Sequence, residues 1–145
     1  VKSSKWATLS WLEGEDKLQS LVMSIASSDE GRIFMYLMED ITFKASLTFS
    51  EAQLDPSQFF GAKCGPDGVL DPQDPRCAKL TVSGIVSPVK EADAKQHALD
   101  VLFAAHPQMA SWPTDHNFIP CEMAIHEDDG LWMIANFGGG GRLTH

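Results

Sequence analysis

Short segments in which apolar and polar residues alternate recur along most of this chain. Alternation with a period of two is typical of a β-strand that packs one face on a core and leaves the other face in solvent. The pattern predicts strands at 6–11, 21–26, 33–38, 45–49, 78–89, 121–126 and 131–137. Several short antiparallel strands of this kind favour a sandwich or a barrel.

One segment, residues 91–106, has helical periodicity instead. Its apolar residues recur on one helix face, at Ala94, Ala98, Leu102 and Ala105. Pro107 ends the pattern because proline cannot continue a helix. One helix inserted late among antiparallel strands indicates a compact β-barrel with the helix across its outside or one end. We expect residues 1–145 to form one domain that is mainly β, with one or two helices.

Three glycine-containing segments give local predictions. Gly84 lies inside the strand at 78–89 and indicates a β-bulge. The sequence Glu-Asp-Asp-Gly at 127–130 separates the last two predicted strands and indicates a hairpin turn. The run Gly138–Gly141 before Arg142 has exposed amides that could hold a phosphate, but it lacks the GK[ST] pattern. We therefore expect a mobile tail there.

The charge balance excludes one class of partner. The chain has 20 acidic and 11 basic residues, a formal net charge of -9, and its basic residues are scattered singly. Nucleic-acid binding depends on clustered Lys and Arg, so no nucleic-acid partner is expected. The longest apolar run, at 33–38, is far shorter than the roughly 20 residues that cross a bilayer. We expect no membrane span.

Two of the three cysteines bracket a loop. Cys64 and Cys77 enclose a segment rich in Gly, Pro and Asp, within a loop expected at about 54–77. A disulfide would hold this segment and stabilise the fold by roughly 3 kcal/mol; the alternative is two free cysteines in a cytosolic loop. A bridge implies a secretory, endolysosomal or other oxidising lumenal compartment. The third, Cys121, is expected to be a buried and unreactive thiol.

The histidines do not indicate a metal site. Their separations, together with Cys121, match no ligand spacing of a helix or knuckle. We expect His106 to cap the end of the predicted helix, and His116, next to Asp115, to be structural rather than an acid or base. The histidines considered are His97, His106, His116 and His126.

Residues 106–118, HPQMASWPTDHNF, resemble the HPxMxxWPxxHNF block of the CREG proteins. These proteins are relatives of the flavin-binding split barrels typified by pyridoxamine phosphate oxidase. The segment ASLTFSEAQ at 45–53, the spacing of the two loop cysteines and the NFGG at 136–139 are also similar to that family. The resemblance implies a six- or seven-stranded antiparallel split β-barrel. The matching residues of the block are His106, Pro107, Met109, Trp112, Pro113, His116, Asn117 and Phe118.

The same resemblance implies where FMN would lie, against the strands around 23–24 and 34–37. The candidate cofactor residues are Ser24, Thr42 and Lys44. One lysine and a hydroxyl are few for a phosphate that several charge-assisted hydrogen bonds normally hold, so no stoichiometric FMN is expected. The connection at 38–44 is also shorter than in the family, either because this lineage lost a turn and helix or because residues are missing from the sequence.

These observations favour a non-catalytic CREG-like protein that binds a protein partner. The alternatives are an accessory structural subunit of a larger complex, membrane-associated or not, and an FMN-dependent oxidoreductase of the pyridoxamine phosphate oxidase type. The partner is either a second copy in a homodimer or a different protein in a heteromeric complex. Trp112 is expected to anchor on the barrel. The methionines that we expect in the core or at a dimer seam are Met23, Met35, Met38 and Met123.

Overall fold

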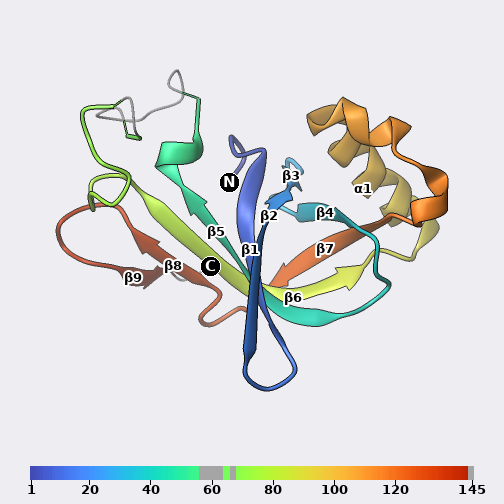
Figure 1. Cartoon of the computed structure of the whole chain (residues 1–145), viewed down its shortest axis with the longest axis horizontal. Coiled ribbons are helices and arrows are strands. Elements are labelled where there is room, and N and C mark those ends of the chain that lie inside the picture. Colours follow the sequence, from blue (N-terminus) through green and yellow to red (C-terminus); the bar gives the residue numbers. More distant parts are fainter. Residues whose placement is uncertain (56–63, 66–67, 144–145) are drawn as a thin grey trace.

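The computed structural model describes residues 1–55, 64–65 and 68–143 (Figure 1). Its main element is a curled antiparallel sheet of seven strands that forms a half-barrel, in the order β2-β1-β5-β6-β7-β4-β3. This confirms the predicted mainly β fold and the antiparallel split barrel. The strands are β1 (Trp6–Glu13), β2 (Lys17–Ser24), β3 (Ala26–Ser27), β4 (Ile33–Leu37), β5 (Phe43–Ser50), β6 (Lys79–Pro88) and β7 (Ile119–Ile125).

Two further strands, β8 (Leu131–Ile134) and β9 (Gly141–Leu143), extend the sheet beside β6. The strands β7 and β8 pair with successive halves of β6, at 84–88 and 79–82, and not with each other. The predicted hairpin at 127–130 is therefore wrong. The Gly130 N–H donates to the His126 carbonyl at 3.1 Å, so the chain makes a short excursion and then continues in the same direction along β6.

The glycines of β6 and of the C-terminal segment differ from their predictions. The ladder between β5 and β6 is continuous, so there is no bulge on that side of Gly84. Gly84 is needed because a Cβ there would overlap the backbone of Ala124 on β7. The predicted mobile tail is also wrong at its end, since Gly141 pairs with Met133. The positive φ of Gly139, 83°, makes the turn that brings β9 back to β8.

The strand β4 separates two apolar cores, because its side chains alternate between the two faces of the sheet. Met35 points into the half-barrel and packs with Leu9 and Leu47. Phe34 points to the other face, where it packs against Ala98 and Leu102. These last two residues are the buried face of helix α1 (Ala92–Ala105), which covers that side of the sheet (Figure 1).

Helix α1 lies one residue inside the predicted range at each end. It begins after Glu91, whose carboxylate accepts hydrogen bonds from the N–H groups of Asp93 and Ala94. The acceptor role lowers the pKa of Glu91. The described residues also form short 3-10 helices: η1 (Glu51–Gln53), η3 (Pro107–Ser111) and η4 (Thr114–His116). Within the described part of the chain, no helix has the length and hydropathy needed to cross a membrane.

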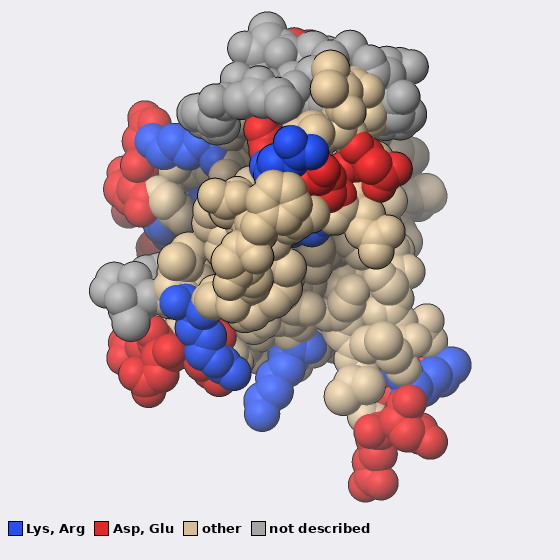
Figure 2. All heavy atoms as spheres, turned by 90° about the vertical axis from the view of Figure 1, so that its left-hand side faces the viewer, with Lys and Arg blue, Asp and Glu red and all other residues tan. Residues whose placement is uncertain are grey.

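The face formed by β8 and β9 has a mixed charge pattern. Figure 2 shows uncharged atoms at the centre of this face, with acidic and basic side chains of both signs around them. Trp132, on β8, is partly exposed there, and Phe137 follows it on the turn to β9. The described residues of this face form no block of basic side chains.

Candidate functional site

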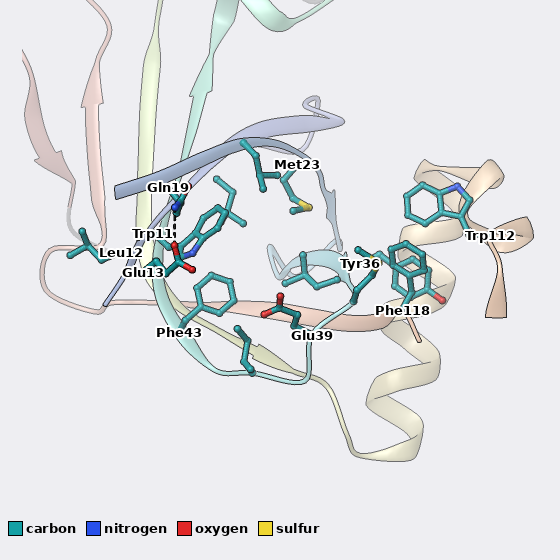
Figure 3. Close-up of a pocket in the computed structure, with 15 residues that line it drawn as sticks. Trp11, Leu12, Glu13, Gln19, Met23, Tyr36, Glu39, Phe43, Trp112 and Phe118 are labelled. Carbon is teal, nitrogen blue, oxygen red and sulfur yellow. Dashed lines mark hydrogen bonds between the residues drawn. The ribbon is translucent and has the colours of Figure 1, made fainter. Parts of the chain in front are cut away.

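A cavity of about 770 Å³ opens at one end of the half-barrel (Figure 3). It lies between the β1–β2 hairpin, the connection from β4 to β5, and the segment that follows α1. Its volume is within the range of roughly 300–1,000 Å³ that is usual for small-molecule sites. Most of the lining is apolar, and the aromatic side chains among it are Trp11, Tyr36, Phe43, Trp112 and Phe118.

The aromatic side chains form two groups on opposite sides of the cavity (Figure 3). On one side Trp11 meets Phe43 edge to face, with ring centroids 6.2 Å apart. On the other side Tyr36 stacks on Phe118 at 5.1 Å, and Trp112 lies 4.7 Å from Phe118. Trp112 thus packs on the barrel through a β4 side chain, and the family block builds one wall of the cavity.

The carboxylates and the side-chain amide that line the cavity belong to Glu13, Gln19 and Glu39. Gln19 Nε2 donates to Glu13 Oε2 at 2.9 Å, and Lys17 Nζ also lies 2.9 Å from that oxygen. These two neighbours, Lys17 first, lower the pKa of Glu13. Glu13 is therefore already paired.

Glu39 has a different environment. Its carboxylate points into the cavity between the two aromatic groups (Figure 3). Among the described residues it has no hydrogen-bond or ion-pair partner. The neighbouring Asp40 is instead paired with Lys90, with Nζ and Oδ1 3.0 Å apart. Glu39 is thus the free charge of the cavity.

The structure does not bring the FMN candidates together at this cavity. Ser24 ends β2 opposite Trp6, and Thr42 and Lys44 are exposed. Lys44 lies on the outer face of β5, since the adjacent Phe43 and Ala45 pack into the half-barrel. Among the described residues, no Lys or Arg lines the cavity. Its lining therefore does not fit the phosphate of FMN, which needs cationic partners.

The two histidines of the family block lie in different environments. His106 is buried, and its Nε2 lies 2.9 Å from the carbonyl oxygen of Ile25. His106 is the C-cap of α1, as predicted, but its imidazole does not make the cap, because the ring contacts the Ile25 carbonyl and links the end of α1 to the strand junction before β3. The His106 backbone N–H caps Leu102 instead. His116 is exposed, 6.2 Å from the Phe118 ring.

The remaining block residues shape the chain between α1 and β7. Met109 is buried in the core beneath α1, whereas Pro107 and Pro113 are exposed at the beginnings of η3 and η4. Asn117 has a positive φ of 52°, a left-handed conformation that ends η4 and turns the chain toward Phe118. The block is therefore a connection whose aromatic side chains serve the cavity.

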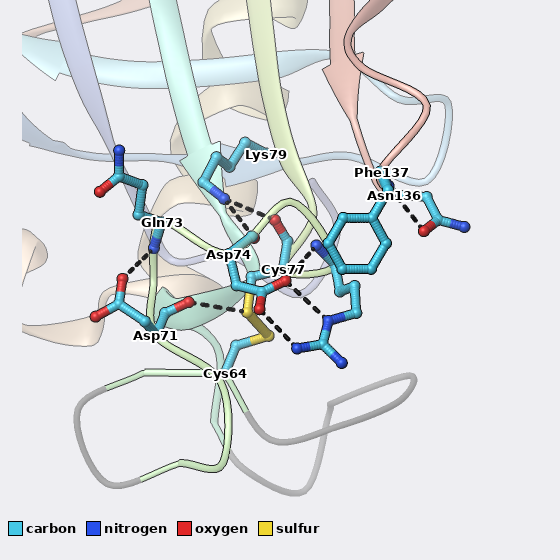
Figure 4. Close-up of polar contacts among 9 residues, drawn as sticks. Cys64, Asp71, Gln73, Asp74, Cys77, Lys79, Asn136 and Phe137 are labelled. Atoms are coloured by element: carbon cyan, nitrogen blue, oxygen red, sulfur yellow. Dashed lines mark hydrogen bonds and ion pairs between the residues drawn. A yellow bond between two sulfur atoms is a disulfide. The ribbon is translucent and has the colours of Figure 1, made fainter.

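The loop cysteines form a second feature, far from the cavity. A disulfide joins Cys64 to Cys77 (Figure 4). Of the loop predicted at 54–77, residues 56–63 and 66–67 lie outside the described residues. Two hydrogen bonds hold the described end of the loop near Cys77: Lys79 Nζ donates to the carbonyls of Asp74 and Cys77 at 3.0 and 2.9 Å.

Asp74 and Arg76 fix the end of this loop (Figure 4). Arg76 Nε and Nη2 donate to the two carboxylate oxygens of Asp74 at 2.9 and 2.7 Å. These bonds, with that from the Arg76 backbone N–H, lower the pKa of Asp74 to about 2. The guanidinium also lies 5.3 Å from the centre of the Phe137 ring, so it links the loop to the C-terminal segment.

The third cysteine and the methionines are divided between core and surface. Cys121 is fully buried, and burial raises the pKa of its thiol to about 11. Met35 and Met123 are buried in the half-barrel, whereas Met23 and Met38 line the cavity and Met38 is largely exposed. Within the described residues, no three His, Cys, Asp or Glu side chains gather as a metal-binding group.

Comparison with known proteins now identifies the family. The family model described as "CREG, beta-barrel" matches residues 1–144. The chain belongs to the CREG β-barrel family. Mouse Protein CREG1 is 34% identical over 96 residues, which are 66% of this chain and 38% of that protein. Mouse Protein CREG2 is 27% identical over 146 residues, which cover 94% of this chain and 49% of that protein. The chain thus spans less than half the length of these CREG relatives.

Solved structures show the same fold beyond the CREG proteins. A heme binding protein from Mycobacterium smegmatis has a TM-score of 0.68 and 12% identity, over 98% of this chain and 53% of that one. A FAD and heme binding protein from the same organism has a TM-score of 0.57 and 13% identity, over 98% of this chain and 70% of that one. At these identities the likeness establishes the split-barrel fold alone.

Sequence reasoning missed the charged residue of the cavity. Glu39 follows β4 in a short polar connection, where a glutamate has no distinguishing neighbours. Trp11 gave a usable signal, since it is a large aromatic residue on the inward face of a predicted strand, whereas Phe43 lies before the strand predicted at 45–49. Their meeting depends on the pairing of β1 with β5, which the sequence pattern alone does not specify.

Proposed function

We propose that this CREG-family chain is a non-catalytic protein that acts by protein–protein binding, and that its partner is a second copy of itself. The observation behind the proposal is an exposed apolar face on the β1–β2 hairpin. Leu12, Leu18 and Val22 are 57%, 70% and 65% exposed. Leucines and valines left in water at a sheet edge are typical of a contact surface.

The three side chains share one face because of the register. Leu12 lies directly opposite Leu18, and Ser10 lies opposite Ser20, with their hydroxyl oxygens 3.1 Å apart. Val22 is two residues beyond Ser20 and so lies on the same face. Among the described strands β2 pairs with β1 alone, so its other edge is available there to a partner strand or side chain.

A second copy suits this edge in both charge and register. The net charge of the chain is -9, yet the sequence of β2, KLQSLVMS, contains no acidic residue. Two copies can therefore meet there with little like-charge repulsion. A twofold axis through Ser20 would also place Leu18 of one copy against Val22 of the other, which is the self-complementarity that a closed dimer requires.

The cavity supports a binding role over flavin chemistry. Among the described residues, its lining has no Lys or Arg for a phosphate, and its charged groups are two carboxylates. The Cys64–Cys77 disulfide supports our proposal that the protein works in a secretory, endolysosomal or other oxidising lumenal compartment.

Sedimentation equilibrium at micromolar concentration tests the partner. We expect a dimer for the unaltered chain and a shift to monomer for Leu18→Glu, because a buried carboxylate would face the second copy. Val69→Glu is the matched control. It changes the charge equally at a side chain that is 85% exposed in the disulfide loop, and it should remain dimeric.

Three outcomes would contradict parts of this proposal. A clean monomer of the unaltered chain would exclude the second copy and favour a different protein as partner, as in an accessory subunit. A dimer that survives Leu18→Glu would place the contact elsewhere. Saturable one-to-one binding of FMN at micromolar concentration, followed by flavin fluorescence, would favour the oxidoreductase instead.

A further inference from the structure

We infer that the cavity at the open end of the half-barrel binds a small organic cation with a flat apolar body. This inference does not rest on the proposed dimer, because it concerns the inner side of the β1–β2 hairpin rather than its outer face. It rests on the arrangement of aromatic rings around one free carboxylate.

The walls of the cavity suit a flat apolar body. The Trp11–Phe43 pair stands on one side, and the stacked Tyr36 and Phe118 stand on the other (Figure 3). A flat group between them can contact ring faces and edges on both sides. Trp112 extends the second wall to the mouth of the cavity, where its ring is partly exposed.

The charges around the cavity favour a ligand with a positive charge. Glu39 points into the space between the two walls and is unpaired among the described residues. Lys17 Nζ lies 2.9 Å from the carboxylate of Glu13 and neutralises it. Asp40 and Lys90 neutralise each other next to the mouth. One uncompensated negative charge remains, beside the negative faces of several aromatic rings.

Aromatic faces and a carboxylate attract the same kind of ligand. A cation placed over tryptophan or tyrosine is stabilised by the ring quadrupole, and a nearby carboxylate adds direct attraction. An anionic group such as a phosphate would instead face Glu39 without a compensating cation. The occupant that this cavity favours is therefore opposite in charge to a flavin nucleotide.

Three probes with one ring system test the charge preference: 10-methylacridinium, acridine and acridine-9-carboxylate. In slightly alkaline buffer these are a cation, a neutral molecule and an anion of nearly equal shape. We expect calorimetric titration to show saturable one-to-one binding of the cation, weaker binding of acridine and no binding of the carboxylate. Added salt should weaken the binding of the cation only.

Three variants test whether the charge of Glu39 and the aromatic wall bind the probes. Glu39→Gln keeps the shape of the side chain and should weaken binding of the cation by about fivefold while leaving acridine unchanged. Glu127→Gln removes the same charge from the exposed loop between β7 and β8, and should leave both affinities unchanged. Trp112→Ala should weaken both probes, because it removes part of a wall. Thermal unfolding of each variant confirms that it is folded.

Four results would overturn the inference. These are binding of the anion as tight as that of the cation, equal effects of Glu39→Gln and Glu127→Gln, no binding of the cation at its solubility limit, and loss of cation binding as dimer forms. The last result would assign the cavity to a segment of the second copy. The first three results do not depend on dimer formation, and Leu18→Glu tests the dimer without the probes, so this inference and the proposed dimer fail separately.

Discussion

Arg32 and Glu122 form a two-point ion pair between residues that are 90 positions apart in the chain. Arg32 Nε donates to Glu122 Oε1 at 2.8 Å, and Nη2 donates to Oε2 at 2.6 Å. The guanidinium also lies 5.0 Å from the centre of the Phe34 ring. The pair joins the turn before β4 to β7, beside the core that α1 covers.

Breaking this pair should destabilise the fold. Glu122→Gln removes the charge of a partly buried, two-point interaction, and we expect it to lower the free energy of unfolding by about 1 to 2 kcal/mol. Asp29→Asn is the control, because its pair with Lys2, 3.3 Å apart, is exposed on both sides and should contribute about 0.5 kcal/mol or less. Denaturant unfolding curves measure both; equal effects would contradict the prediction.

Removing the disulfide should lower the free energy of unfolding more than breaking the Arg32–Glu122 pair does. In the double variant Cys64→Ser with Cys77→Ser, we expect the free energy of unfolding to fall by roughly 3 kcal/mol, since the unfolded chain gains the freedom of the loop. Reducing agent should produce a similar loss in the unaltered chain and none in the variant. A non-reducing peptide map that shows both thiols free would contradict the bridge.

Asp74 should contribute to the acid sensitivity of the protein. Its folded pKa is about 2, below the ordinary value of 3.8, because Arg76 binds its charged form. The stability that it provides is therefore present above about pH 4 and is lost as the pH falls toward 2. We expect Asp74→Asn to flatten the stability curve in this window, whereas Asp128→Asn on an exposed loop should not. Parallel curves for all three proteins would disagree with this assignment.

Cys121 should be unreactive in the folded protein. It is fully buried, and its raised pKa, about 11, leaves almost no thiolate near neutral pH. We expect a thiol reagent to label it about a hundredfold more slowly in buffer than in denaturant, with Cys121→Ser as the blank. Fast labelling of the native chain would show that β7 opens easily.

The alternation of apolar residues predicted most of the sheet, and its errors have clear causes. The N-terminal half of β2 was missed because Leu18 faces solvent, so the strand lacks a buried pattern there. The strand β9 is too short and too glycine-rich to have one. The turn at 127–130 was misread because the same residues suit a hairpin or an excursion, and only pairing with β6 decides between them.

The site was less predictable than the fold. The family block drew attention to Trp112 and Phe118, because large aromatic side chains in the connection after a helix usually pack against another part of the fold. It could not locate Glu39, because the cavity forms where three segments distant in sequence meet. The carboxylate of Glu39 becomes a candidate binding group only because the fold places aromatic rings around it.

The order of the strands limits how far the half-barrel can move. Its two sides, β2 and the β3–β4 pair, are consecutive in the chain although they lie at opposite ends of the sheet path. The short link between them is Ile25. The carbonyl oxygen of Ile25 lies 2.9 Å from His106 Nε2, and the N–H of Ile25 donates to the Lys5 carbonyl at 3.0 Å. The link between the two sides of the half-barrel is therefore held through both of its backbone polar groups. We therefore expect any widening that admits a ligand to come from bending of the β1–β2 hairpin, whose tip at 14–16 pairs with no strand among the described residues, rather than from separation of β2 from β4.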